Sequence, residues 1–204
     1  MNTKILIWDR IVRAGHWLLV CSFMTAYMSA ESERWRVVHV VSGCLVFATV
    51  IMRVVWGFVG SYHARFINFV RHPKHAWTYL KSLILEKLEH HEGHNPAGGW
   101  AVLGLLSLSL LASVTGWMTY NNVGGAKLSE GHEFASNLAV LLVIVHVLAV
   151  IASSYLHREN LITSMFTGLR YGNLTARIRD TSTASICLYF LVLACIAYAA
   201  YRYT

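Results

Sequence analysis

Charged side chains are scarce in this sequence of 204 residues, because aspartate, glutamate, lysine and arginine together make up only 13% of it. Soluble globular domains average about 25% charged residues, whereas 56% of this chain is hydrophobic, so a soluble domain is excluded. The formal net charge of +7 collects in particular loops, which argues against a nucleic-acid-binding protein. The composition instead indicates a polytopic membrane protein with one helical bundle.

The cysteine pattern excludes several kinds of redox centre. The four cysteines lie in apolar runs at irregular spacing, and no Cys-x-x-Cys occurs; they are Cys21, Cys44, Cys187 and Cys195. Zinc ribbons, iron–sulfur clusters and covalently attached c-type haem depend on such spacings. We therefore expect the cysteines to be small packing residues. No cleavage-site pattern follows the first apolar run, so we expect that run to be a retained membrane span.

Apolar runs long enough to cross a bilayer dominate the rest of the chain. A hydrocarbon core about 30 Å thick takes about 20 helical residues. We expect an all-α integral membrane protein, with four bundled helices in residues 1–168 and a polar linker plus a fifth C-terminal transmembrane helix in 169–204. The expected spans are residues 14–30, 37–59, 98–120, 132–156 and 184–201, and an amphipathic surface helix is expected at 76–88.

Basic residues indicate the orientation of these spans. They cluster before the first span, between the second and third, and after the fourth, whereas the two remaining loops are short and mixed in sign. The positive-inside rule therefore predicts that the N-terminus lies in the cytoplasm and the C-terminus lies outside the membrane.

Four histidines fall at two matched depths in the expected bundle. His132 and His146 are fourteen residues apart, so at ~100° and ~1.5 Å per residue they share one face, roughly 21 Å apart along the axis. His39 enters the second span at the outer level of His132, and His16 enters the first span at the inner level of His146. Low-spin haem b needs two neutral imidazoles, from different helices, on opposite faces of its macrocycle.

We therefore expect two b haems, with an inner iron held by His16 and His146 and an outer iron held by His39 and His132. A lone intramembrane histidine is more often a hydrogen-bonded helix contact, but two level-matched pairs favour haem. Zinc fits poorly, since no third cysteine, histidine or carboxylate shares either depth.

Four further residues lie where a haem or a quinone would need them. Gly43 and Gly116 leave room for a flat macrocycle, although each could equally be a helix-packing glycine. Arg53 shares a face with His39 but lies at the inner level, where it would pair with a haem propionate or reach lipid phosphates. His157, at the inner end of the fourth span, would donate to a propionate or a quinone oxygen, or simply complement the helix dipole.

The remaining histidines lie in the polar stretch between the second and third spans; they are His63, His72, His75, His90, His91 and His94. The run from His90 to His94 could bind a metal ion. A solvated loop is the simpler interpretation of such a polar segment, and it is the one that we expect.

Three motifs in this chain resemble the prokaryotic cytochrome b561 family, whose superfamily includes the b-type subunits of nickel–iron hydrogenases. They are Arg13-Ala14-Gly15-His16-Trp17, then His39-Val40-Val41-Ser42-Gly43 with Arg53, and His132-Glu133 with His146 and His157-Arg158-Glu159-Asn160-Leu161. The resemblance covers about residues 6–168. It implies a four-helix core with two b haems, ligated by the four histidines named above, that exchanges electrons with the quinone pool. A longer cytoplasmic loop and the fifth span depart from the family.

These features together predict a di-haem b-type cytochrome of the bacterial inner membrane that transfers electrons between an outer-side redox partner and the quinone pool. It would be the membrane anchor and electron-transfer subunit of a respiratory oxidoreductase, with no catalytic residue of its own. The partner would be a cytochrome c, a dehydrogenase or a hydrogenase subunit, and the fifth span could form a homodimer contact.

The alternative function is that of a stand-alone superoxide:quinone oxidoreductase. Such an enzyme would need a positive funnel at the outer haem, which Arg34, Arg36 and Lys127 could supply. Four acidic residues nearly cancel that charge; they are Glu31, Glu33, Glu130 and Glu133. A third possibility is a membrane protein without redox function, in which the histidines only join helices.

Overall fold

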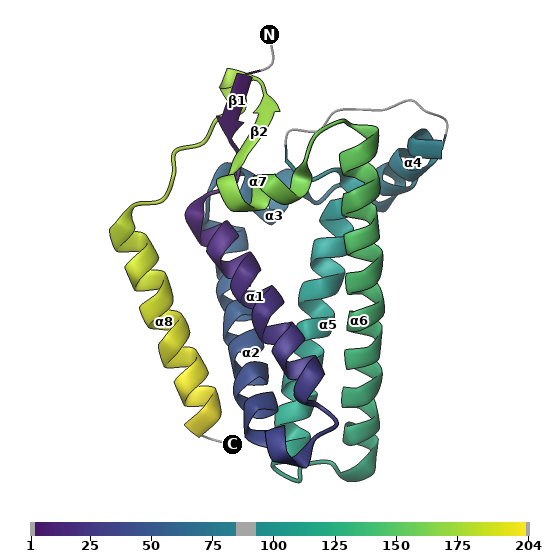
Figure 1. Ribbon diagram of the computed structural model, residues 1–204, viewed down its shortest axis with the longest axis vertical. Coiled ribbons are helices and arrows are strands. Elements are labelled where there is room, and N and C mark those ends of the chain that lie inside the picture. Colours follow the sequence, from purple (N-terminus) through teal and green to yellow (C-terminus); the bar gives the residue numbers. More distant parts are fainter. Residues whose placement is uncertain (1–2, 85–92, 203–204) are drawn as a thin grey trace. The chain divides into compact units, whose positions relative to one another are not determined.

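The structure, a computed structural model, describes residues 3–84 and 93–202 and is mostly helical, as predicted (Figure 1). Two short strands are the exception. In chain order the elements are β1 (Thr3–Leu6), α1 (Arg10–Ser29), η1 (Glu33–Trp35), α2 (Arg36–Val59), η2 (Tyr62–Ala64), α3 (Phe66–Phe69), α4 (Pro73–Ile84), α5 (Pro96–Tyr120), α6 (Gly125–Leu156), α7 (Leu161–Thr167), β2 (Leu169–Gly172), η3 (Leu174–Ala176) and α8 (Thr183–Arg202).

Within the described residues, three helical segments are long and apolar enough to cross a membrane: Glu33–Val59, Pro96–Tyr120 and Gly125–Leu156. A shorter apolar stretch, Thr183–Ala199, makes up most of α8. These segments confirm the predicted class, a helical membrane bundle. The 20-residue helix α1 carries two arginines and His16 in its first two turns, so its crossing of the membrane stays a prediction, as does that of α8.

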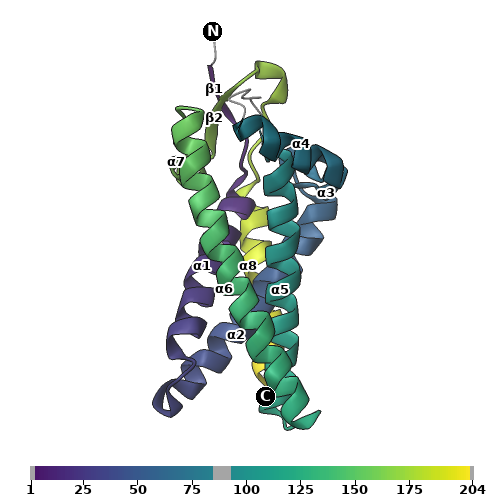
Figure 2. The ribbon, with the colours of Figure 1, turned by 90° about the vertical axis from the view of Figure 1, so that its right-hand side faces the viewer.

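Two helices, α1 and α6, begin four or more residues earlier than predicted. Asp9 precedes α1, and its Oδ1 accepts a hydrogen bond from the backbone N–H of Val12 at 2.9 Å, a capping contact that lets the helix begin at Arg10. α6 begins at Gly125, directly after a turn in which Asn122 and Gly124 have positive φ angles of 57° and 81°. His132 therefore lies two turns inside α6, which runs on as one long helix (Figure 2).

The predicted surface helix is present as α4, which starts at Pro73, three residues earlier than expected. Trp77 is 62% exposed, and the Lys81 ammonium lies 5.3 Å from the centre of its ring. Tyr79 on the other face is only 4% exposed. The predicted residues 85–88 lie outside the described part of the chain.

The chain forms two compact units, of which the first contains both strands and comprises the described residues of 1–13, 55–104 and 142–181. In this sheet unit β1 pairs antiparallel with β2, with Thr3 opposite Gly172. The backbone N–H groups of Ile7 and Trp8 both donate to the Gly168 carbonyl. Gly168 has a φ of 80°, and a Cβ there would lie 2.6 Å from the Trp8 carbonyl oxygen, so the position requires glycine.

A small hydrophobic core fills the sheet unit, formed by Ile5, Ile7, Trp8, Val12 and Ala64. No strand is predicted from the sequence in residues 1–13 or 157–183, so this sheet was not expected. Each strand has only four residues, which is too few for a clear alternation of apolar and polar side chains. The two strands also lie far apart along the chain, so no hairpin pattern connects them.

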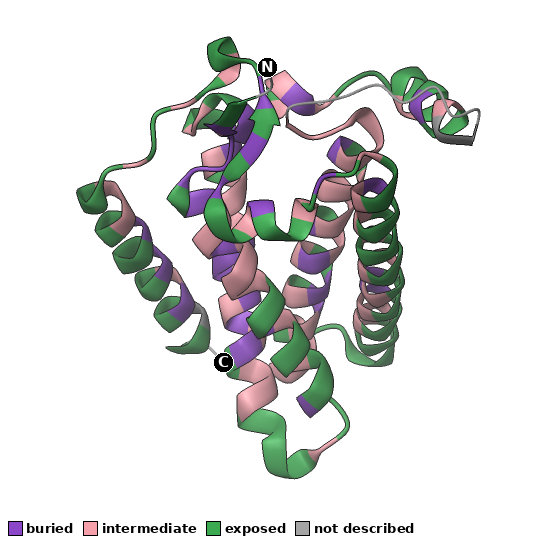
Figure 3. Cartoon of the chain, turned by 45° about the horizontal axis from the view of Figure 1, so that its top comes forward, coloured by how far each residue is buried: buried purple, intermediate pink, exposed green. Residues whose placement is uncertain are grey.

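The second unit, the helix unit, comprises the described residues of 14–54, 105–141 and 182–204. Tyr189 of α8 packs on α1 at Gly15. A Cβ at that position would lie only 2.8 Å from the Tyr189 hydroxyl, so the absence of a side chain there leaves room for the tyrosine. Tyr189, Leu193 and Ala197 form a buried stripe at four-residue spacing. Cys44 is buried as predicted, whereas the other three cysteines are exposed. Most of α6 is exposed (Figure 3), and from Leu138 to Leu156 its exposed side chains are aliphatic or aromatic, as a lipid-facing helix requires.

Candidate haem site

Two of the predicted ligands, His39 of α2 and His132 of α6, lie close together within the helix unit, with their ring planes nearly perpendicular. Their ring centroids are 6.2 Å apart, and their planes make an angle of 84°. A metal–imidazole bond is about 2.0 Å long and the nitrogen lies about 1.1 Å from the ring centre, so two rings across one iron have centroids about 6.2 Å apart. The observed separation therefore fits two imidazoles that share one iron.

The other ring nitrogen of each histidine is held by a backbone carbonyl. Nδ1 of His39 donates to the carbonyl oxygen of Ala26 on α1 at 2.8 Å, and Nδ1 of His132 donates to that of Ala112 on α5 at 2.9 Å. A carbonyl oxygen can only accept, so the proton is assigned to Nδ1 and the lone pair to Nε2. This tautomer is the one that binds a metal through Nε2, and the carbonyl contact is the usual second partner of a ligating histidine.

Four helices thus meet at this outer site, since α2 and α6 supply the rings and α1 and α5 supply the carbonyls. Across the described residues, no group of three histidine, cysteine or acidic side chains could hold a metal ion. Two imidazoles alone suit haem, whose macrocycle supplies the remaining four nitrogen ligands, better than a tetrahedral zinc ion.

The two predicted glycines differ in their surroundings. A Cβ at Gly116 would lie 2.8 Å from Cε1 and 3.0 Å from Nδ1 of His132, so Gly116 makes room for the ligand ring itself. At Gly43, by contrast, no neighbouring atom of the described chain lies within 4 Å of a Cβ position. The face of α2 one turn from His39 is therefore smooth and open, as the approach of a flat macrocycle requires.

The family model of prokaryotic cytochrome b561 matches residues 7–168, which include all four predicted ligands. The chain belongs to this family. It is a multi-pass membrane cytochrome of b type, and its family implies haem b. The helix α8 lies beyond the matched residues.

Curated relatives align with this cytochrome over most of their own length. A "Probable Ni/Fe-hydrogenase B-type cytochrome subunit" of Rhizobium leguminosarum bv. viciae is 22% identical over 214 residues, covering 82% of this chain and 89% of the relative. The protein of that name from Azotobacter vinelandii is 28% identical, with 83% and 89% covered. A "Probable Ni/Fe-hydrogenase 1 B-type cytochrome subunit" of Escherichia coli K12 is 22% identical, with 85% and 95% covered. No solved structure matches the chain.

The predicted inner ligands of the cytochrome belong to different compact units. His16 lies on α1 in the helix unit, beside Trp17 with ring centroids 5.4 Å apart, and Arg53 lies on α2 in the same unit. His146 lies on α6 in the sheet unit. The pairing of His16 with His146, and of Arg53 with a propionate, stays a prediction.

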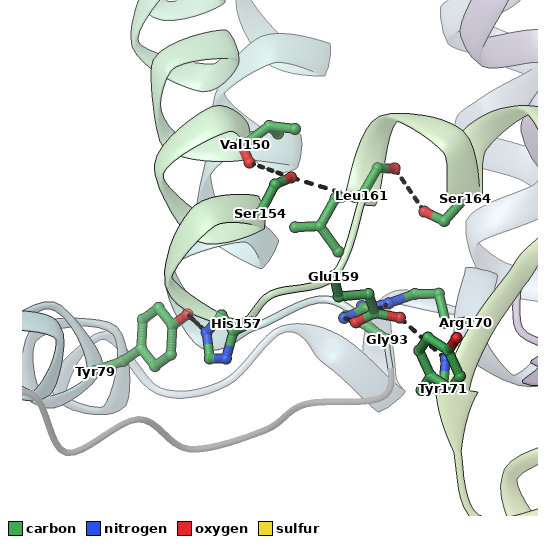
Figure 4. Close-up of polar contacts among 10 residues, drawn as sticks. All are labelled: Tyr79, Gly93, Val150, Ser154, His157, Glu159, Leu161, Ser164, Arg170 and Tyr171. Atoms are coloured by element: carbon green, nitrogen blue, oxygen red, sulfur yellow. Dashed lines mark hydrogen bonds and ion pairs between the residues drawn. The ribbon is translucent and has the colours of Figure 1, made fainter. Parts of the chain in front are cut away.

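His157 follows directly after α6, and its Nε2 lies 3.5 Å from the hydroxyl of the buried Tyr79 of α4 (Figure 4). Two residues further on, Glu159 forms an ion pair of 2.7 Å with Arg170, and both side chains are only 8% exposed. Arg170 also donates to the Gly93 carbonyl, and Glu159 accepts from the backbone N–H of Tyr171. These contacts are not predictable from the sequence, because no local pattern links residues at such separations along the chain.

Two histidines of the polar stretch are enclosed by the protein, and one of them, His94, belongs to the run that we expected to be a solvated loop. His63 is 8% exposed, and its Nε2 lies 2.9 Å from the Ala176 carbonyl, to which it donates. His94 packs against the rings of Trp8 and Phe69, with centroids 4.7 and 4.4 Å away. Both residues belong to the sheet unit. His90 and His91 of the possible metal-binding run lie outside the described residues.

Proposed function

We propose that this cytochrome carries electrons singly between a redox partner outside the membrane and the quinone pool, through two b haems. The observation that carries the proposal is the outer pair, His39 and His132, whose ring separation and Nδ1 contacts both suit one shared haem iron. By the spacing along α6, His146 with His16 would hold a second haem at the inner level.

Each residue of the outer site has a definable task. Haem, when bound, supplies an iron that changes reversibly between two oxidation states. His39 and His132 present Nε2 lone pairs, while the carbonyls of Ala26 and Ala112 fix the tautomer and the ring orientation. Gly116 gives the His132 ring its space, and Gly43 offers a surface for the macrocycle. At the inner level, Arg53 would neutralise a propionate.

We infer that the partner is of the hydrogenase class. The curated relatives are named as cytochrome subunits of Ni/Fe hydrogenases, and they match more than four-fifths of this chain. The distribution of basic residues supports an inner-membrane protein with a cytoplasmic N-terminus and a periplasmic C-terminus. In that orientation His39 and His132 lie at the outer side, where such a partner would deliver electrons.

Quinone would be reduced at the inner end. His157 and Tyr79 lie together there, and both can donate a hydrogen bond to a quinone oxygen. Residues 1–168 would form the di-haem domain, with residues 169–204 as an added linker and helix.

Purification from native membranes tests this function. We expect hydrogenase-type subunits to co-purify in stoichiometric amounts, and added quinone to reoxidise the chemically reduced cytochrome. Isolation of the chain alone would favour the superoxide-oxidising alternative instead. A reduced-minus-oxidised optical spectrum without haem b bands would contradict the proposal altogether.

A further inference from the structure

Beyond the four ligands, one cationic side chain lies next to the outer site. Arg36 is the first residue of α2, one turn before His39, and its guanidinium carbon lies 5.3 Å from the ring centre of Tyr120 on α5. The contact lies wholly within the helix unit. An arginine stacked on an aromatic ring from another helix is fixed in place while its N–H groups stay available to an anion.

The position of Arg36 on α2 lines up with the open glycine. Arg36 and Gly43 are seven residues apart, which is two turns less ~20°, so they share one face with ~10 Å between them along the axis. A macrocycle that lies against Gly43 would therefore have Arg36 beyond its outer edge. Propionate groups project from the edge of haem and are its only anionic substituents.

α5 supplies a second group at the same level. Thr119 lies three residues beyond Gly116, and its Oγ1 is buried with no hydrogen-bond partner among the described residues. Thr115, one turn earlier, instead donates its hydroxyl to the Leu111 carbonyl of its own helix at 2.7 Å. A buried hydroxyl without an acceptor costs about 1–3 kcal/mol, so Thr119 is suited to an acceptor that the chain itself does not provide.

The contacts that Arg36 makes within the chain do not explain its position. Among the described residues it forms an ion pair with Glu33 at 3.7 Å, and the two side chains are 59% and 91% exposed. Such an exposed pair contributes little, and the Tyr120 ring carries no charge that would neutralise the guanidinium.

We propose that Arg36 and Thr119 bind a propionate of the outer haem, with Tyr120 holding the guanidinium in place. This inference rests on the proposed outer haem at His39 and His132. Arg36 and Thr119 would be positioning residues that set the orientation and the reduction potential of that haem, and neither ligates the iron. The same contacts weaken the alternative use of Arg36 as a funnel for superoxide, since a propionate would occupy it.

Redox titration of the purified full chain, followed optically, tests the role of Arg36. A nearby positive charge favours the ferrous over the ferric form, so Arg36→Gln lowers the midpoint of the outer haem. For a unit charge roughly 10 Å away and partly screened by solvent, we expect a twofold to tenfold change in the oxidised-to-reduced ratio, or about 18–59 mV. The outer haem is identified as the one lost in His132→Ala.

Matched variants separate this contact from general surface charge. Arg36→Lys keeps the charge and is expected to retain most of the wild-type midpoint potential. If Arg36→Gln fails to fold, the lysine variant still provides a comparison with wild type. Arg34→Gln removes a neighbouring arginine, whose guanidinium lies over Trp35 at 5.9 Å, and is expected to leave both midpoints unchanged. Equal shifts in the Arg34 and Arg36 variants, or no shift in either, would overturn the inference.

Haem transfer to an excess of apomyoglobin tests Thr119 independently of potential. Loss of one neutral-to-charged hydrogen bond is expected to raise the rate of outer-haem loss about tenfold to a hundredfold in Thr119→Val. Thr115→Val, which removes only a bond within its own helix, is the control and is expected to change little. Unaltered haem loss in Thr119→Val would overturn its role. Wild-type protein without haem would instead refute the proposed function, so the two failures are distinguishable.

Discussion

Replacing Gly116 by alanine perturbs the outer site through a single methyl group. The new Cβ would lie 2.8 Å from Cε1 and 3.0 Å from Nδ1 of His132. Ordinary carbon contacts are about 3.5–4.0 Å, so the ring must move by about 0.7 Å or more. That movement disturbs the 2.9 Å hydrogen bond from Nδ1 to the Ala112 carbonyl, which fixes the tautomer and the direction of Nε2.

The size of the effect follows from this lost support. Removing the second partner of a metal-ligating histidine costs about 10–100-fold in metal affinity, which is about 1.4–2.7 kcal/mol. Helix propensity acts in the opposite direction, because alanine favours a helix by about 0.5–1 kcal/mol over glycine. Gly116→Ala should therefore weaken outer-haem binding 10–100-fold without loss of helical structure.

The assay compares haem b content per chain and the rate of haem transfer to apomyoglobin for wild type and variants. Gly131→Ala is a matched control, since it neighbours His132 and no neighbouring atom of the described chain lies within 4 Å of its Cβ position. It should bind haem as wild type does. A Gly116→Ala protein with wild-type haem content and transfer rate would refute the reasoning from ring position to haem affinity.

Three further predictions concern other contacts. Gly43→Ala fills open space on α2, so the apoprotein should melt at the same or a higher temperature while haem content falls; unchanged haem content would show that no macrocycle packs there. The 84° angle between the His39 and His132 planes predicts a strongly anisotropic low-spin ferric EPR signal, and a signal typical of parallel rings would contradict it. Glu159→Gln leaves the Arg170 charge buried and should destabilise the sheet unit by about 3 kcal/mol in detergent unfolding, a loss that Glu159→Gln with Arg170→Met should largely reverse.

Apolar run length was sufficient to predict the positions of the long helices, but not where each one begins. The polar residues Lys127 and Glu130 are typical of a loop, yet they lie in the first two turns of α6. The preceding turn, in which Asn122 and Gly124 have positive φ angles, already ends before Gly125, where the helix begins. Asp9 is a recognisable N-cap residue, and its signal could have placed the start of α1. The pairing of β1 with β2 had no comparable local signal.

Side-chain type and spacing predict that His39 and His132 lie at one level, and the structure places their ring centroids 6.2 Å apart. Their carbonyl partners could not be predicted, since Ala26 and Ala112 act through the backbone and alanine carries no sequence signal for that. The contact of Gly116 with the His132 ring, rather than with a macrocycle, likewise depends on how α5 approaches α6. The spacing of residues along a helix predicts their depth in the membrane. Which side chains or carbonyls they contact depends on how the helices pack.

Haem stoichiometry in purified wild-type protein and two single variants tests the central claim most directly. A pyridine haemochrome assay should find two haem b per chain in wild type and one in each of His132→Ala and His146→Ala, with the remaining haem still low-spin. Wild-type protein with no haem b, or a His132→Ala variant that keeps the full wild-type haem content, would contradict the assignment of the outer site.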